Sequence, residues 1–121
     1  MADKWTLDWS ILKELSEENL RQIPSSSGVY RLSYQANDEK IYVFYVGKAE
    51  NLQQRLLDHL MRRDDNICIG RMLKSAPCYF RYAIVNNEDI RNGAERALYL
   101  HYKPQCNSQE PNGPDIEINF D

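Results

Sequence analysis

The side chains best suited to chemistry are grouped around one predicted strand-to-helix turn and supply a phenol, an amine, a guanidinium and an imidazole: Tyr45, Lys48, Arg55 and His59. Arg55 and His59 are four residues apart, so they share one face of a helix, and Arg62 follows three residues later. Grouped cations of this kind could bind a phosphate-bearing partner. An ordinary solvated surface of mixed charge would contain the same residue types, so both interpretations are open. The meaning of the group depends on the elements that position it.

A strand and a helix are predicted on the two sides of this turn. Residues 41–46 form an unbroken apolar and aromatic run, which is typical of a buried strand. Leucines at positions 52, 56, 57 and 60 then recur at helical spacing. Asn51 can cap that helix, because its side chain can accept from the first unpaired backbone N–H groups. The helix is expected to run from residue 51 to about residue 63.

The flanking segments complete an α+β domain. Residues 29–34 favour a strand, and the polar residues 35–40 connect it to the 41–46 strand as a β-hairpin. A third strand is predicted over 79–85, with helices over 67–75 and from about 90 or 92 to 102, where Pro104 ends the second. We therefore expect a small, mostly antiparallel three-stranded sheet flanked by helices.

The two ends of the chain differ from this central part. Residues 8–23 have helical apolar spacing and predict two short helices, so residues 1–27 are expected to form an N-terminal helical extension. Residues 28–107 make up the main domain. The acidic tail, residues 108–121, contains an alternating apolar run that predicts either an edge strand or disorder.

Composition narrows the class of protein. The chain has 121 residues, enough for one modest core, and a net charge of −3 that argues against a nucleic-acid partner. Residues 48–81, however, carry seven basic and four acidic residues, so a locally basic surface is possible. No apolar run approaches the roughly 20 residues of a membrane span. Three widely spaced cysteines favour free thiols in a reducing cytoplasm over a disulfide or a zinc site.

Several motifs in order resemble one known family. Residues 28–30 read Gly-Val-Tyr and residues 45–47 read Tyr-Val-Gly, which resembles the GIY-YIG signature with valine in place of isoleucine. The run YVGKAENLQQRL over residues 45–56 is similar to a longer stretch of that family. Residues 95–98 (ERAL) and 102–107 (YKPQCN) are similar to its glutamate helix and its terminal KPxxN motif. The resemblance is greatest to the N-terminal nuclease domain of the bacterial excision-repair incision subunit.

This resemblance implies an endonuclease that hydrolyses DNA phosphodiesters with one divalent cation, Mg²⁺ or Mn²⁺. Glu95 would be the only protein ligand of that cation, since Mg²⁺ often keeps several waters and binds one or two carboxylates. Arg55 would clamp the scissile phosphate through its planar guanidinium. Tyr30 and Tyr45 match the paired signature tyrosines, one of which acts as general base. The sequence leaves open which of them takes the proton, and we favour Tyr30.

Other positions have less defined roles. His59 falls where many relatives carry a tyrosine, so it is expected either to bind phosphate, to relay a proton, or to be an ordinary surface residue. Asn107 matches the terminal asparagine of the family and is expected to orient site groups by hydrogen bonding. Three cations, Lys48, Arg62 and Arg63, are expected to contact DNA phosphates.

Two functions from different classes follow. The first is a metal-dependent DNA endonuclease that nicks DNA or cleaves particular structures in repair, recombination or restriction. The second is a nucleic-acid-binding or protein-interaction module that keeps the fold but does not cleave. DNA is the expected partner, together with a separate DNA-binding protein or subunit that supplies affinity, and no membrane is expected.

Overall fold

The computed structural model describes residues 3–121. Its elements in chain order are β1 (Asp3–Trp5), β2 (Lys13–Glu14), α1 (Glu17–Leu20), β3 (Gly28–Gln35), β4 (Ile41–Ala49), α2 (Leu52–Leu60), α3 (Ile67–Ser75), β5 (Cys78–Ile84), α4 (Glu88–Tyr102) and β6 (Ile116–Ile118). Across these residues, no helix is long and apolar enough to cross a membrane.

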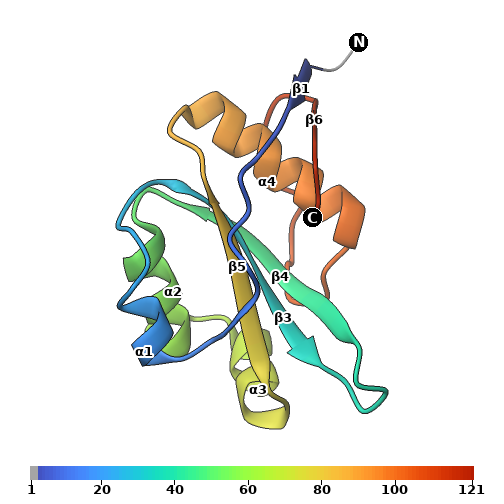
Figure 1. The fold of residues 1–121 in the computed structure, drawn as a ribbon. Coiled ribbons are helices and arrows are strands. Elements are labelled where there is room, and N and C mark those ends of the chain that lie inside the picture. The colour runs from blue at the N-terminus through green and yellow to red at the C-terminus, as the bar shows by residue number, and fades with distance from the viewer. Residues whose placement is uncertain (1–2) are drawn as a thin grey trace.

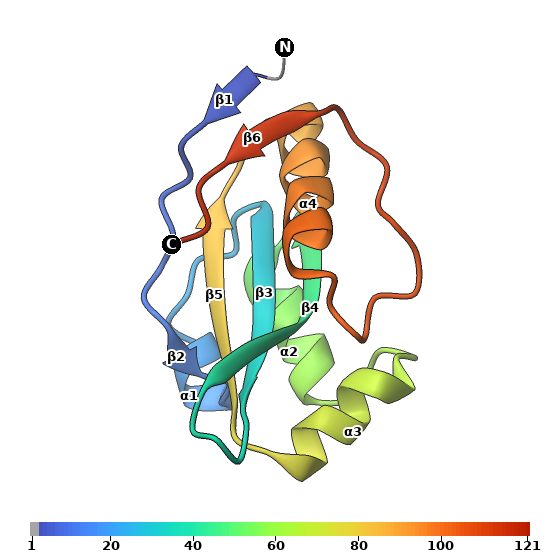
Figure 2. The ribbon, with the colours of Figure 1, turned by 90° about the vertical axis from the view of Figure 1, so that its right-hand side faces the viewer.

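Strand β3 is the centre of the main sheet, with β4 paired to one edge and β5 to the other (Figure 2). The strand order is β2-β5-β3-β4, and all of its pairings are antiparallel. The predicted α+β architecture and the β3–β4 hairpin are therefore confirmed. Strand β2 adds a short fourth strand to the three that the sequence predicts.

The sheet is covered on both faces (Figure 1). On one face, Tyr30 and Leu32 of β3 join the core formed with helices α1, α2 and α3. Val29 of the same strand packs on the other face with Ala94 and Leu98 of α4. This division follows from the alternation of side chains along a strand, which sends neighbouring residues to opposite faces.

A β-bulge in β4 changes which face of the sheet its side chains point to. The pairing of β3 with β4 shifts by one residue after Leu32, which leaves Phe44 as an extra residue on β4. As a result Phe44 and Tyr45, although consecutive, both pack against the core on the α2 side. Tyr45 pairs with Leu32 before the shift, on the same face as Tyr30, and the rings of Tyr45 and Tyr30 lie 6.2 Å apart, measured between centroids.

The predicted pair of helices over residues 8–23 is wrong in its first part. Residues 8–15 contain no helix, and Lys13 and Glu14 pair with β5 instead. Only α1 is helical, and Ser16 caps it as expected. The apolar spacing suits a helix locally, but the free edge of β5 offers backbone partners that a short isolated helix does not have.

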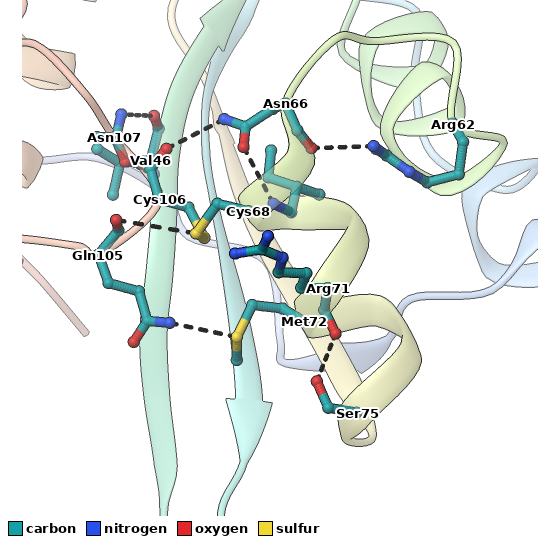
Figure 3. The surroundings of a disulfide bond; sticks show 11 residues. Val46, Arg62, Asn66, Cys68, Arg71, Met72, Ser75, Gln105, Cys106 and Asn107 are labelled. Carbon is teal, nitrogen blue, oxygen red and sulfur yellow. Dashed lines mark hydrogen bonds between the residues drawn. A yellow bond between two sulfur atoms is a disulfide. The ribbon is translucent and has the colours of Figure 1, made fainter.

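The expectation of free thiols is wrong for two of the three cysteines. Cys68 at the start of α3 and Cys106 after α4 form a disulfide, with their Cα atoms 5.3 Å apart (Figure 3). Cys78 is free and buried. The pairing depends on a contact between α3 and the segment after α4, 38 residues apart, which cysteine spacing in the sequence does not reveal.

The C-terminal segment is an ordered part of the molecule. Its alternating run forms β6, which pairs in parallel with β1, and Ile116 is buried in the core that includes α4. The Asn119 side chain accepts from the Leu7 backbone N–H and donates to the Leu7 carbonyl. Of the two alternatives for the tail, the strand is therefore the one observed.

Candidate active site

A hollow of about 360 Å³ opens beside the outer edge of β4. Its walls come from β4, the loop before α3, α4 and the chain that follows α4: Tyr45, Asn66, Glu95 and residues 106–112. Figure 2 shows the chain leaving α4, passing beside β4 and then rising to β6. Elements from both faces of the sheet thus meet at this hollow.

Tyr30 lies fully buried behind the hollow, on the central strand. Its hydroxyl is 2.7 Å from Nε2 of His59, and a hydrogen bond joins them. Tyr30 pairs with Gly47 across the hairpin, and a Cβ atom at position 47 would lie 2.4 Å from the Tyr30 hydroxyl. The glycine of the second signature triad is therefore needed because the phenol of the first triad lies against its Cα.

His59 is a fully buried residue in the last turn of α2. Its Nδ1 is paired with a carboxylate oxygen of Asp64, and Arg62 pairs with the other oxygen of that carboxylate. The Asp64 side chain is only 5% exposed. A continuous chain of contacts therefore runs from Tyr30 through His59 to Asp64.

The protonation states along this chain are mutually consistent. Burial, with the charge of Arg55 adding to it, lowers the pKa of His59 although Asp64 opposes this, so the imidazole is neutral near pH 7. Burial opposes ionisation of Asp64, but hydrogen bonds from His59 and Arg62 outweigh it and lower its pKa. Burial and neighbouring Tyr45 raise the pKa of Tyr30 well above its usual value. Near pH 7 the chain of contacts therefore consists of a neutral phenol, a neutral imidazole and an ionised carboxylate.

Arg55 projects from α2 towards both signature tyrosines. Burial raises the pKa of Tyr45 as it does that of Tyr30, and the Arg55 guanidinium acts against burial at both phenols. Arg55 is about half-buried. A guanidinium so placed stabilises negative charge that develops at either phenol or on a phosphate in the hollow.

Glu95 reaches the hollow from α4 on the opposite face of the sheet. Burial raises the pKa of its carboxyl, and the nearby Lys48 ammonium opposes that rise. Lys48 itself donates to the side chain of Asn92, one turn earlier on α4.

Within residues 3–121 no group of three or more His, Cys, Asp and Glu side chains could hold a metal. Two carboxylates line the hollow, Glu95 and Glu110, and Glu110 is paired with Arg96. Mg²⁺ commonly keeps several waters and binds one or two carboxylates, so Glu95 would be sufficient to hold it.

The side chain of Asn107 is hydrogen-bonded to the backbone of β4. Its amide nitrogen donates to the Val46 carbonyl and its oxygen accepts from the Val46 N–H, each at 2.9 Å (Figure 3). Asn66 donates in the same way to the Cys106 carbonyl at 3.0 Å. Asn107 thus caps the free edge of β4 next to Tyr45, and Asn66 holds the segment that carries Asn107.

The structure brings some predicted site residues together and not others. Those gathered around the hollow or directly behind it are Tyr30, Tyr45, Lys48, Arg55, His59, Glu95 and Asn107. Arg62 is turned instead towards Asp64 and the Asn66 carbonyl, and Arg63 forms an ion pair with Asp58 on the surface. Neither of these two arginines lines the hollow.

Asp64 and Asn66 are site residues that the sequence analysis does not identify. Asn66 caps α3, because its side chain accepts from the Ile69 N–H, and an asparagine before an apolar helical run is a recognisable signal of that role. Asp64 carries no comparable local signal. Its partner His59 is five residues earlier, and only the loop between α2 and α3 brings the two together.

Known proteins are similar to this chain in sequence. Residues 26–108 match the family model described as the UvrC-like GIY-YIG domain. UvrABC system protein C of Rickettsia rickettsii (strain Sheila Smith) is 35% identical over 94 residues, which cover 78% of this chain and 14% of that protein. The protein of the same name from Rickettsia bellii (strain RML369-C) is 33% identical over 111 residues, covering 89% of this chain and 16% of that protein. The chain thus spans a small part of these relatives.

Solved structures agree on the fold. The GIY-YIG N-terminal endonuclease domain of UvrC from Thermotoga maritima, bound to magnesium, superimposes with a TM-score of 0.55 at 24% identity, covering 74% of this chain and 92% of that one. A point mutant of the same domain, bound to its catalytic divalent cation, gives a TM-score of 0.56 at 24% identity and covers 76% and 93%. Because the family model matches most of the chain, the protein belongs to the family of UvrC-like GIY-YIG domains.

Proposed function

We propose that this protein is a divalent-metal-dependent endonuclease that hydrolyses phosphodiester bonds in DNA. The observation that supports it most is the grouping of five side chains from β3, β4, α2 and α4 around one hollow. The phenol of Tyr45 and the carboxylate of Glu95 line the hollow, and a second phenol, a guanidinium and an imidazole lie behind Tyr45. Hydrolysis of a phosphodiester needs a deprotonated water and positive charge where the phosphate oxygens gain negative charge. These side chains supply both requirements.

In this proposal Glu95 holds a Mg²⁺ or Mn²⁺ ion, and the ion, when bound, supplies Lewis-acid stabilisation of the developing charge. Arg55 clamps the scissile phosphate with its planar guanidinium. Lys48 lies beside Glu95 and adds a second positive charge at the phosphate side of the hollow. Arg62 does not contact the phosphate in this proposal, because its guanidinium is paired with Asp64. It contributes to catalysis indirectly by holding that carboxylate.

We assign the role of general base to Tyr30, because its hydroxyl already has a proton acceptor in Nε2 of His59. Tyr45 lines the hollow and orients the water and phosphate. Tyr30 is fully buried, so this assignment requires Tyr45 or Arg55 to shift when the substrate binds. Tyr30→Phe should then abolish the chemical step, and Tyr45→Phe should weaken both that step and substrate binding.

A non-cleaving module on the same fold is the second candidate. The net charge of −3, and the engagement of Arg62 and Arg63 in ion pairs, favour it, because few cations are left free for a DNA backbone. The relatives carry the name UvrABC system protein C, and this chain covers about 14% of their length. We therefore propose that a separate DNA-binding protein or subunit supplies affinity and that the protein acts in the cytoplasm.

Incubation of the purified protein with supercoiled plasmid separates the two candidates. The endonuclease predicts nicked and linear products with Mg²⁺ or Mn²⁺ and none with a chelator. Branched DNA and a bent or damaged duplex, tested in parallel, define the preferred substrate. Binding of these DNAs without cleavage under every metal condition would support the non-cleaving module.

A further inference from the structure

The imidazole of His59 has two nitrogens with different partners, and the placement of the one ring proton decides what the other nitrogen can do. Nε2 lies 2.7 Å from the Tyr30 hydroxyl, and Nδ1 is paired with Asp64. A neutral imidazole accepts at one nitrogen only. If Nδ1 carries the proton, Nε2 is free to accept from Tyr30.

The carboxylate oxygen of Asp64 that does not contact His59 is also held by a partner. The Arg62 guanidinium pairs with the second carboxylate oxygen. It also donates to the Asn66 carbonyl at 2.9 Å, as Figure 3 shows. A Cβ atom at Gly70 of α3 would lie 2.8 Å from that guanidinium, so the glycine leaves the space that Arg62 occupies. Arg62 also adopts a left-handed backbone conformation, with φ of 60°. The placement of Arg62 thus holds the Asp64 carboxylate against Nδ1 of His59.

We infer that Asp64 is a positioning residue, which keeps the ring proton of His59 on Nδ1 so that Nε2 can take the proton of Tyr30 during the proposed DNA cleavage. The inference rests on the proposed function and goes beyond it in naming the residue that orients the relay. Buried partners of a histidine nitrogen commonly fix both its tautomer and its orientation.

The proton balance of the step is simple. The water oxygen bonds to phosphorus, and the bond from phosphorus to the leaving ester oxygen breaks. The Tyr30 oxygen takes a proton from that water as the hydroxyl proton of Tyr30 moves to Nε2 of His59, and the leaving oxygen takes a proton from solvent. The Nδ1–H bond to Asp64 stays intact, and the imidazolium that forms faces a carboxylate. The relay resets when the Nε2 proton returns through Tyr30 to solvent. No redox partner or further reactant is needed.

Asp64 affects the stability of this imidazolium directly. The charged and titratable groups that surround His59 are Arg55 and Asp58 on α2, Asp64 in the following loop, Tyr30 on β3 and Tyr45 on β4. Of these, Asp64 alone is hydrogen-bonded to Nδ1 among the described residues. Its removal should therefore slow turnover and move the acid limb of the pH–rate profile, where His59 becomes protonated, to lower pH.

The test compares Asp64→Asn with Asp65→Asn, which makes the same change of charge one residue later at an exposed site. Asp64→Asn is expected to lower the cleavage rate about 10- to 100-fold. Its KM for DNA should stay close to that of the wild type, and its acid limb should shift. Asp65→Asn should leave the rate and the profile unchanged. Equal rates and profiles in all three proteins would overturn the inference.

Long-range ¹H–¹⁵N spectra of the imidazoles provide a measurement without DNA or metal. The chain has two histidines, so a His101→Gln variant assigns the His59 signals. Near pH 7 the wild type should show His59 protonated at Nδ1 and unprotonated at Nε2. Protonation at Nε2 in the wild type would overturn the inference even if Asp64→Asn fails to fold. If the wild type shows no nuclease activity, the proposed function fails, and the tautomer still decides the role of Asp64.

Discussion

The candidate site depends on a few side chains that act on one another more than on solvent. Arg55 is the clearest case, because its guanidinium affects the pKa of both Tyr30 and Tyr45 from a half-buried position. A group placed in this way is able to respond to charge that develops during the reaction. It should therefore matter more for turnover than for binding.

Replacing Arg55 by Ala tests this role. The variant should lose about 10²- to 10³-fold in kcat, comparable to removal of one donor from a preorganised anion site, with DNA affinity within a few-fold of the wild type. Single-turnover cleavage and a separate DNA-binding titration measure the two quantities. An equal loss of binding and turnover would show that Arg55 is a docking contact.

Burial of His59 predicts how stability depends on pH. The unfolded state has an ordinary histidine pKa of about 6.5, whereas burial lowers the pKa in the native state. Below about pH 6.5 the unfolded state therefore binds a proton that the native state does not, and the free energy of unfolding should fall with pH down to the native pKa. His59→Gln should reduce this slope, and His101→Gln, at an exposed position, should retain it. Urea unfolding from pH 5 to 8 would check this.

At the scale of elements, the sequence predicts correctly those helices and strands that local residue patterns determine. The hairpin, α2, α3 and the strand β5 follow from apolar spacing and capping, and all are observed close to their expected bounds. The failures depend on distant partners. Residues 8–15 form no helix, and Lys13 and Glu14 pair with the available edge of β5 instead. The bulge at Phe44 depends on pairing across the hairpin. Asp64 was missed for the same reason, since its role exists only where the α2–α3 loop meets His59.

The close contact between Gly47 and Tyr30 across the hairpin predicts the effect of a substitution at Gly47. A methyl group there would collide with the Tyr30 hydroxyl and push the phenol away from Nε2 of His59. Gly47→Ala should lower the free energy of unfolding by about 1–3 kcal/mol and reduce cleavage by more than this loss of folded protein explains. Chemical denaturation and the plasmid assay measure the two effects. A variant with wild-type activity would show that the contact between Tyr30 and His59 is not needed.

The disulfide links α3 to the segment that carries Asn107. Because it closes a loop of 38 residues, the chain-entropy model gives it about 4 kcal/mol of stabilisation. Reduction should lower the midpoint of urea unfolding, and a Cys68→Ser, Cys106→Ser double variant should match the reduced protein with or without reductant. In the reducing cytoplasm proposed for this protein, the reduced form sets the working stability. Identical unfolding of the oxidised and reduced proteins would contradict the prediction.

At the scale of the whole molecule, the site lies where the two layers meet. Tyr30, Arg55 and His59 belong to the layer of α2, whereas Glu95 comes from α4 on the other face, and they come together only around the outer edge of β4. The chain after α4 closes that edge through Asn107 before it returns to pair with β1. Family motifs allowed all of these residues to be named from the sequence, but only the fold shows which of them share the hollow.

The most direct test of this arrangement is the metal-dependent nicking of supercoiled plasmid by Glu95→Ala compared with Glu50→Ala, an exposed glutamate outside the hollow. Glu95→Ala should fold normally, because its side chain is only partly buried, and should lose all detectable cleavage with Mg²⁺ or Mn²⁺. Glu50→Ala should cut as the wild type does. Cleavage that survives Glu95→Ala at the wild-type rate would contradict a metal-dependent site at this hollow.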